Sequence, residues 1–136
     1  MREVKSKARD MSVYRLQRAR EDLLSAQNNY KANDYRTANN RAYYAIFHSL
    51  RAVLALDEFD SRKHSGVISE FRRRYIRTGI LSAEISDMIG DAFIERNKSD
   101  YDDMYVLSKS ATETQIKNAE AVLSAISDYL ATFSIV

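Results

Sequence analysis

The sequence contains no cysteine and no proline, and only three glycines and two histidines occur among its 136 residues. Without cysteine the chain can form neither a disulfide framework nor a thiolate nucleophile, and zinc sites built on thiolates are excluded. The two histidines, His48 and His64, cannot supply a metal site that needs three. We therefore expect neither a bound metal nor a cofactor.

Long hydrophobic runs are absent as well. No apolar run approaches the roughly 18 residues that a membrane-spanning helix needs. The opening segment, MREVKSKARDMSVYRLQRAR, is charged and lacks the apolar core of a signal peptide. These two absences predict a cytoplasmic protein that has no membrane association.

The residues that are present have the balance of a soluble globular chain, with 45% hydrophobic and 29% charged residues. The length suits one domain, so we expect a single domain over residues 1–136 with its core at about 11–131. Residues 1–77 carry 17 Lys and Arg against 9 Asp and Glu, whereas residues 78–136 carry 4 against 10. This asymmetry indicates a polyanion or an oppositely charged protein as a partner.

Scarce helix breakers and the lack of any alternating strand pattern predict an all-α fold. Apolar residues recur at three-four spacing, which favours an antiparallel, up-and-down bundle of about five helices in two long helix pairs. Gly90 falls inside one of these patterns, where a glycine indicates a kink or a close approach. The expected helices cover about 11–31, Asp34 to Leu56, a third from a Ser65 cap to Gly79, a fourth after a Ser82 cap, and about 103–131.

One face of the second expected helix carries an unusual stripe of polar and aromatic residues. Arg41, Tyr44, His48 and Arg51 lie at i, i+3, i+7 and i+10, so they share that face. Two arginines beside a histidine would attract a phosphate and lower the histidine pKa. Alternatively, the stripe is a solvated face with a packed tyrosine and histidine, and spacing by itself favours this alternative.

A second basic cluster, formed by Arg72, Arg73, Arg74 and Arg77, follows in the third helix. It would suit the phosphate backbone of a nucleic acid, or its stems would simply cover apolar surface while the charges stay in water. His64, just before this helix, either completes the loop by hydrogen bonding or lies at the mouth of a ligand site.

The densest polar stretch, RNKSDYDD, is predicted to separate the last two helices. Arg96 and Tyr101 would then stand on either side of this break, with side chains converging on one point where the arginine can hold a phosphate. Helix capping by Asp100, Asp102 or Asp103 accounts for most of the same cluster. A calcium loop is not indicated, because no glycine turn accompanies the carboxylates.

Several motifs, in this order, resemble those of the HEPN family, the higher eukaryote and prokaryote nucleotide-binding domain. The resemblance covers about residues 11–130 and rests on NRAYYAIFHSLRAVLAL, HSGVISEF, TGIL and RNKSDYDD. It implies a bundle of about five helices that forms a homodimer. It further implies a toxin–antitoxin pair with a minimal nucleotidyltransferase, and, in active members, a metal-independent endoribonuclease.

The family signature is an Arg, commonly followed by a polar residue, and a His after about four to six residues. Arg96 and Asn97 match the first two positions, but Tyr101 stands where the His would fall. Ordinary tyrosine has a pKa of about 10 and is a poor base at neutral pH. Tyr101 could still donate a proton, so a stronger base would have to be His48 or His64.

The resemblance also implies a regulatory tyrosine, which the partner enzyme modifies with AMP, two residues after the signature His. That position is Asp103 here, so Tyr101 and Tyr105 are the nearest hydroxyls that could accept AMP.

Two functions follow as hypotheses. The first is a ribonuclease toxin that cuts single-stranded RNA in a cleft shared by two protomers. In it Arg96 binds phosphate, Asn97 and Asp100 orient, Tyr101 donates a proton, and His48 or Arg41 forms the opposite wall, with Tyr44, Arg51 and His64 as further RNA-binding residues. The second is a non-catalytic subunit that binds a nucleotide or nucleic acid, or presents Tyr101 to a nucleotidyltransferase. A third hypothesis is a helical dimer in which the polar segment RNKSDYDD only caps helices.

Overall fold

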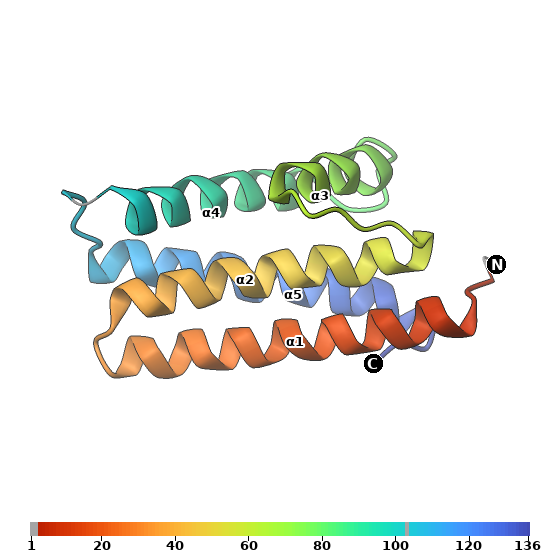
Figure 1. Cartoon of the computed structure of the whole chain (residues 1–136), viewed down its shortest axis with the longest axis horizontal. Helices are drawn as coiled ribbons and strands as arrows, with labels where there is room; N and C mark the ends of the chain where they lie inside the picture. Colours follow the sequence, from red (N-terminus) through yellow and green to blue (C-terminus); the bar gives the residue numbers. More distant parts are fainter. Residues whose placement is uncertain (1–2, 103) are drawn as a thin grey trace.

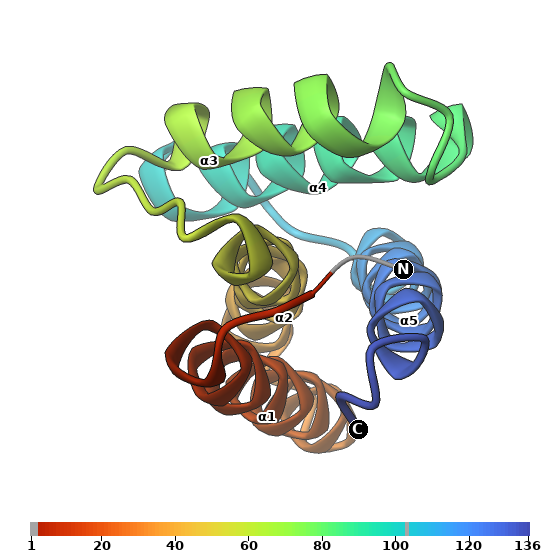
Figure 2. The same ribbon diagram turned by 90° about the vertical axis from the view of Figure 1, so that its right-hand side faces the viewer.

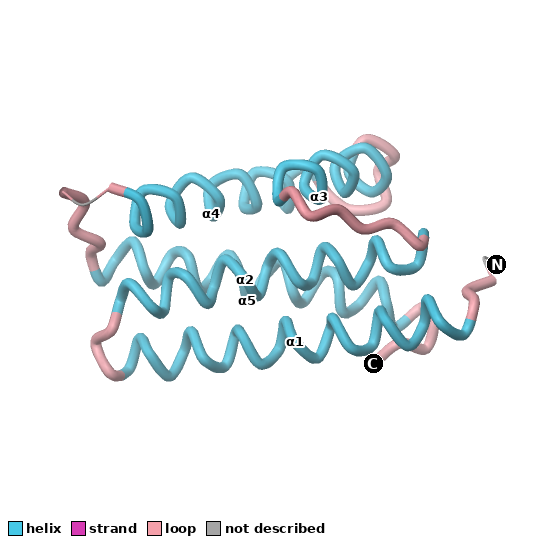
Figure 3. Tube along the Cα trace, in the orientation of Figure 1, coloured by secondary structure: helices cyan, strands magenta, loops and turns pink. Residues whose placement is uncertain are grey.

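The computed structural model describes residues 3–102 and 104–136, and the described chain forms five α-helices with no strand (Figures 1 and 3). The all-α bundle expected from the sequence is therefore confirmed. Two short irregular turns interrupt the pattern, a 3₁₀ turn at Ala55–Asp57 and a π turn at Arg72–Ile76. The helices are α1 (Ser6–Lys31), α2 (Tyr35–Leu54), α3 (His64–Phe71), α4 (Ala83–Tyr101) and α5 (Lys109–Ala131).

Helix α2 is the centre of the fold. It packs against α1, α4 and α5, and small side chains such as Ala38, Ala42 and Ala45 are fully buried on it. Small residues let neighbouring helix backbones approach closely, and the larger Leu16 of α1 and Ile126 of α5 fill the remaining space. Viewed along the bundle, α1, α2 and α5 form one group, and α3 and α4 lie together across it (Figure 2).

Two glycines matter for how α3 and α4 are joined and approach each other. Gly79 has a φ of +79°, which a residue with a side chain rarely adopts, and it ends the segment as the sequence indicated. Gly90 lies within α4, where a Cβ atom would come 3.1 Å from the Arg72 guanidinium. The expectation of a close approach at Gly90 is therefore confirmed, and its partner is Arg72.

Helix α4 differs most from its prediction. The segment RNKSDYDD does not separate two helices, because α4 continues through Arg96 to Tyr101. Within this last part Ser99 is buried and the Asn39 amide of α2 donates to the Glu95 carbonyl at 3.4 Å. Arg96 also donates to the Tyr44 hydroxyl of α2, so the end of α4 packs against α2 although its residues are polar.

Other boundaries also differ from those expected. Helix α1 begins at Ser6 rather than near residue 11, and α5 begins at Lys109, after a Ser108 cap that accepts from the Ala111 amide. Ser65 lies in the first turn of α3 and is not its cap. The Asp34 cap is confirmed, since its carboxylate accepts from the Thr37 amide at 3.2 Å.

Two expectations about the segment after α4 have different outcomes. Asp102 is the residue at which α4 ends, but its carboxylate accepts from the Met104 amide in the following loop and caps neither α4 nor α5. Asp103, the other candidate at this point, lies outside the described residues. Across the residues that the structure describes, no helix is both long and apolar enough to cross a membrane.

Candidate functional site

A cavity of about 520 Å³, here called the first cavity, opens where α2, the start of α3 and the second half of α4 meet. Several sequence-predicted site residues line it, including Arg96, Tyr101 and His64. The complete lining is Tyr44, Lys63, His64, Ser65, Phe93, Arg96, Asn97 and Tyr101.

Arg96 lies at the centre of this site. Its Nε donates to Asp100 at 2.9 Å and its Nη2 donates to the Tyr44 hydroxyl at 3.3 Å. The guanidinium carbon also lies 5.2, 5.5 and 5.3 Å from the ring centres of Tyr43, Tyr44 and Tyr101. Since only 12% of the arginine side chain is exposed, these contacts fix the orientation of a charge that borders the cavity.

A network of hydrogen bonds links the Arg96–Asp100 pair to α2 and α1. The same Asp100 oxygen that accepts from Arg96 also accepts from the Asn40 amide at 2.9 Å. Asn40 in turn accepts two bonds from Arg41, at 3.1 and 2.7 Å, and Arg41 donates to Asp22 of α1 at 3.1 Å. The network joins α1, α2 and α4, so Asp100 holds Arg96 in place and does not itself line the cavity.

His64 is the histidine of the first cavity. Its ring stacks on Phe47 with 4.0 Å between centres, and its Nδ1 lies 2.8 Å from the Tyr43 hydroxyl. Burial lowers the His64 pKa, and the nearby charges of Arg96 and Arg51 lower it further. At neutral pH this imidazole is therefore uncharged and has a nitrogen available as a proton acceptor. Burial raises the pKa of Tyr43, so its phenol stays protonated.

His48 lies elsewhere, against α1. Its Nε2 is 3.7 Å from the Asp22 carboxylate, and the cavity lining does not include it. Burial, together with the charges of Arg18 and Arg51, lowers the His48 pKa to about 4. Because the ring is neutral at physiological pH, the contact with Asp22 is not an ion pair there. His48, expected as a catalytic residue, thus does not line the first cavity, whereas His64 does.

The other members of the α2 stripe are divided in the same way. Tyr44 lines the first cavity, whereas Arg51 pairs with Asp60 at 2.9 Å and Arg41 pairs with Asp22. Both arginines are thus already bound to carboxylates within the chain. Neither of them lines the first cavity, whereas Arg96, which also pairs with a carboxylate, does.

Comparison with known proteins gives this geometry its context. A family model described as HEPN domain matches residues 12–129. This chain belongs to the HEPN domain family.

Individual relatives agree with this assignment. A Methanocaldococcus jannaschii protein named "Putative toxin MJ0142" is 30% identical over 115 residues, which covers 85% of this chain and 78% of that protein. A Thermotoga maritima "UPF0332 protein" is 33% identical over 113 residues, covering 83% and 86% respectively. A second M. jannaschii protein, "Putative toxin MJ0605", is 36% identical over 83 residues, covering 61% and 62%.

The HEPN signature positions lie together on α4. Arg96, Asn97 and Tyr101 all line the first cavity, but they come from one continuous helix and not from two helix ends as expected. Tyr101, which replaces the signature histidine, is 72% exposed. Its ring faces Arg96, so the pair that the sequence singled out is in contact.

The two hydroxyls expected as AMP acceptors in this HEPN chain differ in environment. Tyr105 is half-buried, and its hydroxyl donates to the Glu95 carboxylate. That bond raises the pKa of Tyr105 to about 12, because ionising the phenol would place two negative charges side by side. Tyr101 is the more accessible of the two.

Three residues that line the first cavity were missed in the sequence. Lys63 and Ser65 flank His64 at the start of α3, and Phe93 lies one turn before Arg96. The signal for Phe93 was its i, i+3 spacing to Arg96, which places both on one side of α4. No local pattern marked Lys63, since its place in the lining depends on where the start of α3 meets α4 in the fold.

Among the described residues, no group of three or more histidine or carboxylate side chains could hold a metal ion.

Proposed function

We propose that this chain is a HEPN-type toxin and a metal-independent endoribonuclease that cuts single-stranded RNA in the first cavity. We further propose that it acts in the cytoplasm as a homodimer and is held in check by a minimal nucleotidyltransferase as antitoxin. One observation carries the proposal: the lining of the first cavity combines the cations Lys63 and Arg96 with aromatic rings and, among its described residues, no carboxylate. A cation suits a phosphate and a ring suits a base, so this combination favours a nucleotide chain.

The start of α3 strengthens the anion preference. Lys63, His64 and Ser65 line the cavity at the N-terminal end of this helix, which carries a partial positive charge. The first amide groups of a helix lack partners within it and can donate to phosphate oxygens. Arg96 approaches from α4, so a phosphate in the cavity would meet positive groups from two elements.

In the proposed reaction, the His64 imidazole takes the proton of a ribose 2′-hydroxyl, and the oxygen attacks the adjacent phosphorus. This step requires the His64 tautomer in which Nδ1 donates to the Tyr43 oxygen and Nε2 carries the free electron pair. The bond from phosphorus to the 5′-oxygen breaks, and that oxygen receives the Tyr101 phenol proton. Arg96 stabilises the negative charge that builds on the non-bridging oxygens. The products are a 2′,3′-cyclic phosphate and a free 5′-hydroxyl.

The test is cleavage of a labelled single-stranded RNA by purified protein in the presence of EDTA. We expect wild-type protein to produce fragments ending in a cyclic phosphate and Arg96→Ala to be at least about a hundredfold slower. Arg62→Ala, at an exposed loop position, is the matched control and should cleave at the wild-type rate. Equal cleavage by wild type and Arg96→Ala would refute the proposal. Sedimentation of the purified protein tests the homodimer.

A second function is favoured by the exposure of Tyr101. The chain would present this phenol to its nucleotidyltransferase partner, and the oxygen would attack the α-phosphorus of ATP, so that AMP is attached and pyrophosphate is released. Tyr101 is open to solvent, whereas the Tyr105 hydroxyl is bonded to Glu95. Such an adduct would occupy the mouth of the first cavity and block RNA, while the unmodified chain would still bind a nucleotide or nucleic acid.

Labelled ATP and the partner enzyme test this second function. Label should enter wild-type protein and Tyr105→Phe, and Tyr101→Phe should remain unlabelled. Labelling of Tyr101→Phe at the wild-type level would exclude Tyr101 as the acceptor.

A further inference from the structure

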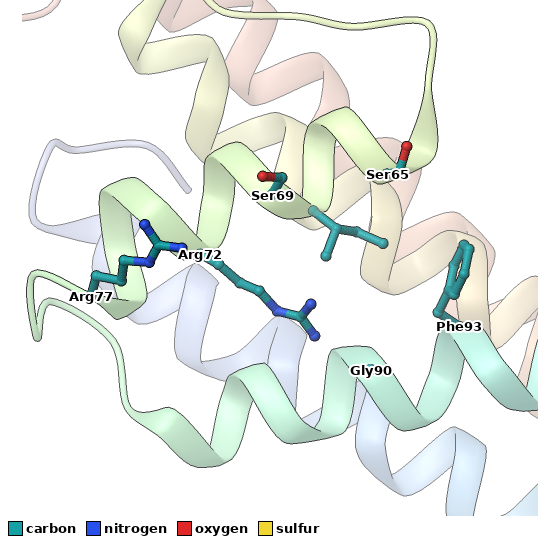
Figure 4. A pocket seen from close by; sticks show the side chains of 7 residues that line it. Ser65, Ser69, Arg72, Arg77, Gly90 and Phe93 are labelled. Carbon is teal, nitrogen blue, oxygen red and sulfur yellow. The ribbon is translucent and has the colours of Figure 1, made fainter.

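A second cavity, of about 320 Å³, lies between α3, the π turn and α4 (Figure 4). Figure 4 shows the Arg72 side chain crossing from the π turn toward α4, above Gly90. The lining residues are Ser65, Ile68, Ser69, Arg72, Arg77, Gly90 and Phe93.

The second cavity adjoins the first. Ser65 and Phe93 line both of them, one from the start of α3 and the other from α4. A polymer bound at Arg96 can therefore pass Ser65 and Phe93 and continue toward Arg72 without leaving the groove between α3 and α4. The phenylalanine at the junction offers a ring on which a base can stack.

The charge of the second cavity is positive. Arg72 donates to the Ser86 hydroxyl at 2.9 Å and to the Ser86 carbonyl at 3.2 Å, both uncharged partners. Within the described part of the chain, neither Arg72 nor Arg77 forms an ion pair, and no carboxylate lines this cavity.

The neighbouring arginines of the same basic cluster differ in this respect. Arg73 and Arg74 bind Glu70 at 2.8 and 2.7 Å, and Arg74 also lies 3.6 Å from Asp57. The cluster that the sequence marked as a possible phosphate site thus divides into two arginines neutralised by carboxylates and two that face a cavity.

The π turn explains how Arg72 and Arg77 come to line one cavity. The Arg77 amide donates to the Arg72 carbonyl at 2.9 Å, a bond that spans five residues. In an ordinary α-helix, residues five apart are rotated by about 140° and point in different directions, whereas the wider turn reduces this rotation. Gly90 lets Arg72 lie close to α4, because a Cβ atom there would come 3.1 Å from the guanidinium and push it aside by a few tenths of an ångström.

We propose that the second cavity is a subsite for a further phosphate of the same RNA strand, held by Arg72 and Arg77. This inference rests on the proposed function and names its substrate class: a single strand of several nucleotides that fills both cavities, not a free mononucleotide. The first cavity binds the phosphate that reacts, and the second binds a neighbouring phosphate along the strand.

The experiment measures binding of a fluorescent six-nucleotide RNA and of AMP to the full chain. Arg72→Gln combined with Arg77→Gln should weaken RNA binding about tenfold or more and flatten its salt dependence, since each lost phosphate contact removes about 0.7 from the slope. Affinity for AMP should stay within about twofold. The matched control is Arg73→Gln, which alters the adjacent arginine of the same turn and should bind RNA like wild type.

A second substitution covers the case in which loss of the Arg72–Ser86 contact unfolds the protein. Ser69 is exposed and lines the second cavity, so Ser69→Glu adds a negative charge there without disturbing the core. It should weaken RNA binding about tenfold, whereas Ser69→Gln should not. Wild-type RNA affinity in both Ser69→Glu and the double arginine variant would overturn the subsite while leaving the proposed function intact. Failure of wild-type protein to bind RNA at all would overturn both.

Discussion

His48 and His64 are chemically identical and both contact the rings of Tyr44 and Phe47, yet their surroundings differ. His48 is covered by α1, where the buried Asp22 lies beside it, and only 14% of its side chain is exposed. His64 begins α3 and opens on a cavity that also contains Arg96 and Tyr101. One histidine is enclosed by packing, and the other borders a space that a substrate can enter.

Hydrogen bonding separates the two rings further. The His64 Nδ1 is paired with the Tyr43 hydroxyl, which orients the ring, whereas the His48 Nδ1 is buried and has no hydrogen-bond partner among the described residues. A buried polar atom without a partner destabilises the folded state. A residue type that suits catalysis therefore becomes a catalytic candidate only where its ring is both oriented and accessible, and here that condition favours His64.

The largest expected effect comes from exchanging each histidine in the RNA cleavage assay. His64→Gln should slow cleavage by about 10² to 10⁴, the usual contribution of a general base, whereas His48→Gln should stay within about threefold of wild type. If His48→Gln cleaves more slowly than His64→Gln, the assignment of His64 as the general base is wrong, because the base would then be His48, beside Asp22. Circular dichroism of both variants shows whether either loss comes from unfolding.

In folding stability at acid pH, His48 should matter more than His64, the reverse of their order in the cleavage assay. The His48 pKa falls from about 6.5 in the unfolded chain to about 4 in the folded one, so between these pH values only the unfolded chain takes up the proton. This histidine should therefore remove up to about 3 kcal/mol of folding free energy as the pH falls from about 6.5 to 4, and nothing above that range. Urea unfolding of wild type and His48→Gln at several pH values measures the difference.

Asp22 works against this effect, which makes it a useful control. Burial raises the Asp22 pKa, so its carboxyl takes up a proton more readily in the folded chain and stabilises the folded state as the pH falls. Asp22→Asn should therefore lose stability more steeply than wild type on acidification. If wild type and His48→Gln lose stability in parallel from pH 6.5 to 4, the enclosure of His48 is not what the structure indicates.

A smaller effect is expected from the hydroxyl that orients His64. Tyr43→Phe removes that hydrogen bond but keeps the buried ring, so unfolding free energy should fall by about 1 kcal/mol. Cleavage should slow about tenfold, because the ring loses the contact that fixes its position. Initial cleavage rates at saturating RNA measure the change in kcat. An unchanged kcat would mean that packing on Phe47 alone orients the imidazole.

The helical architecture was predictable because it depends on local properties. A sequence without proline, with apolar residues repeating at three-four spacing, has few alternatives to helix, and Asp34 marks the start of α2 by its side-chain chemistry. Boundaries failed where polar residues found partners on other helices. Arg96 looked like a loop residue, but it donates to Tyr44 of α2, and Asp100 accepts from Asn40 of the same helix.

The sequence by itself determined that the chain is helical and that Arg96, Asn97 and Tyr101 resemble a HEPN signature, because these properties lie within a few consecutive residues. Only the tertiary structure decided which histidine joins them. His48 and His64 precede Arg96 by 48 and 32 residues in the sequence. The position of α1 over His48, and the meeting of α3 and α4 at the first cavity, depend on contacts between residues far apart in the chain. The same holds for the basic cluster, since partners on other elements and a single wide turn determine which arginines are neutralised and which line a cavity.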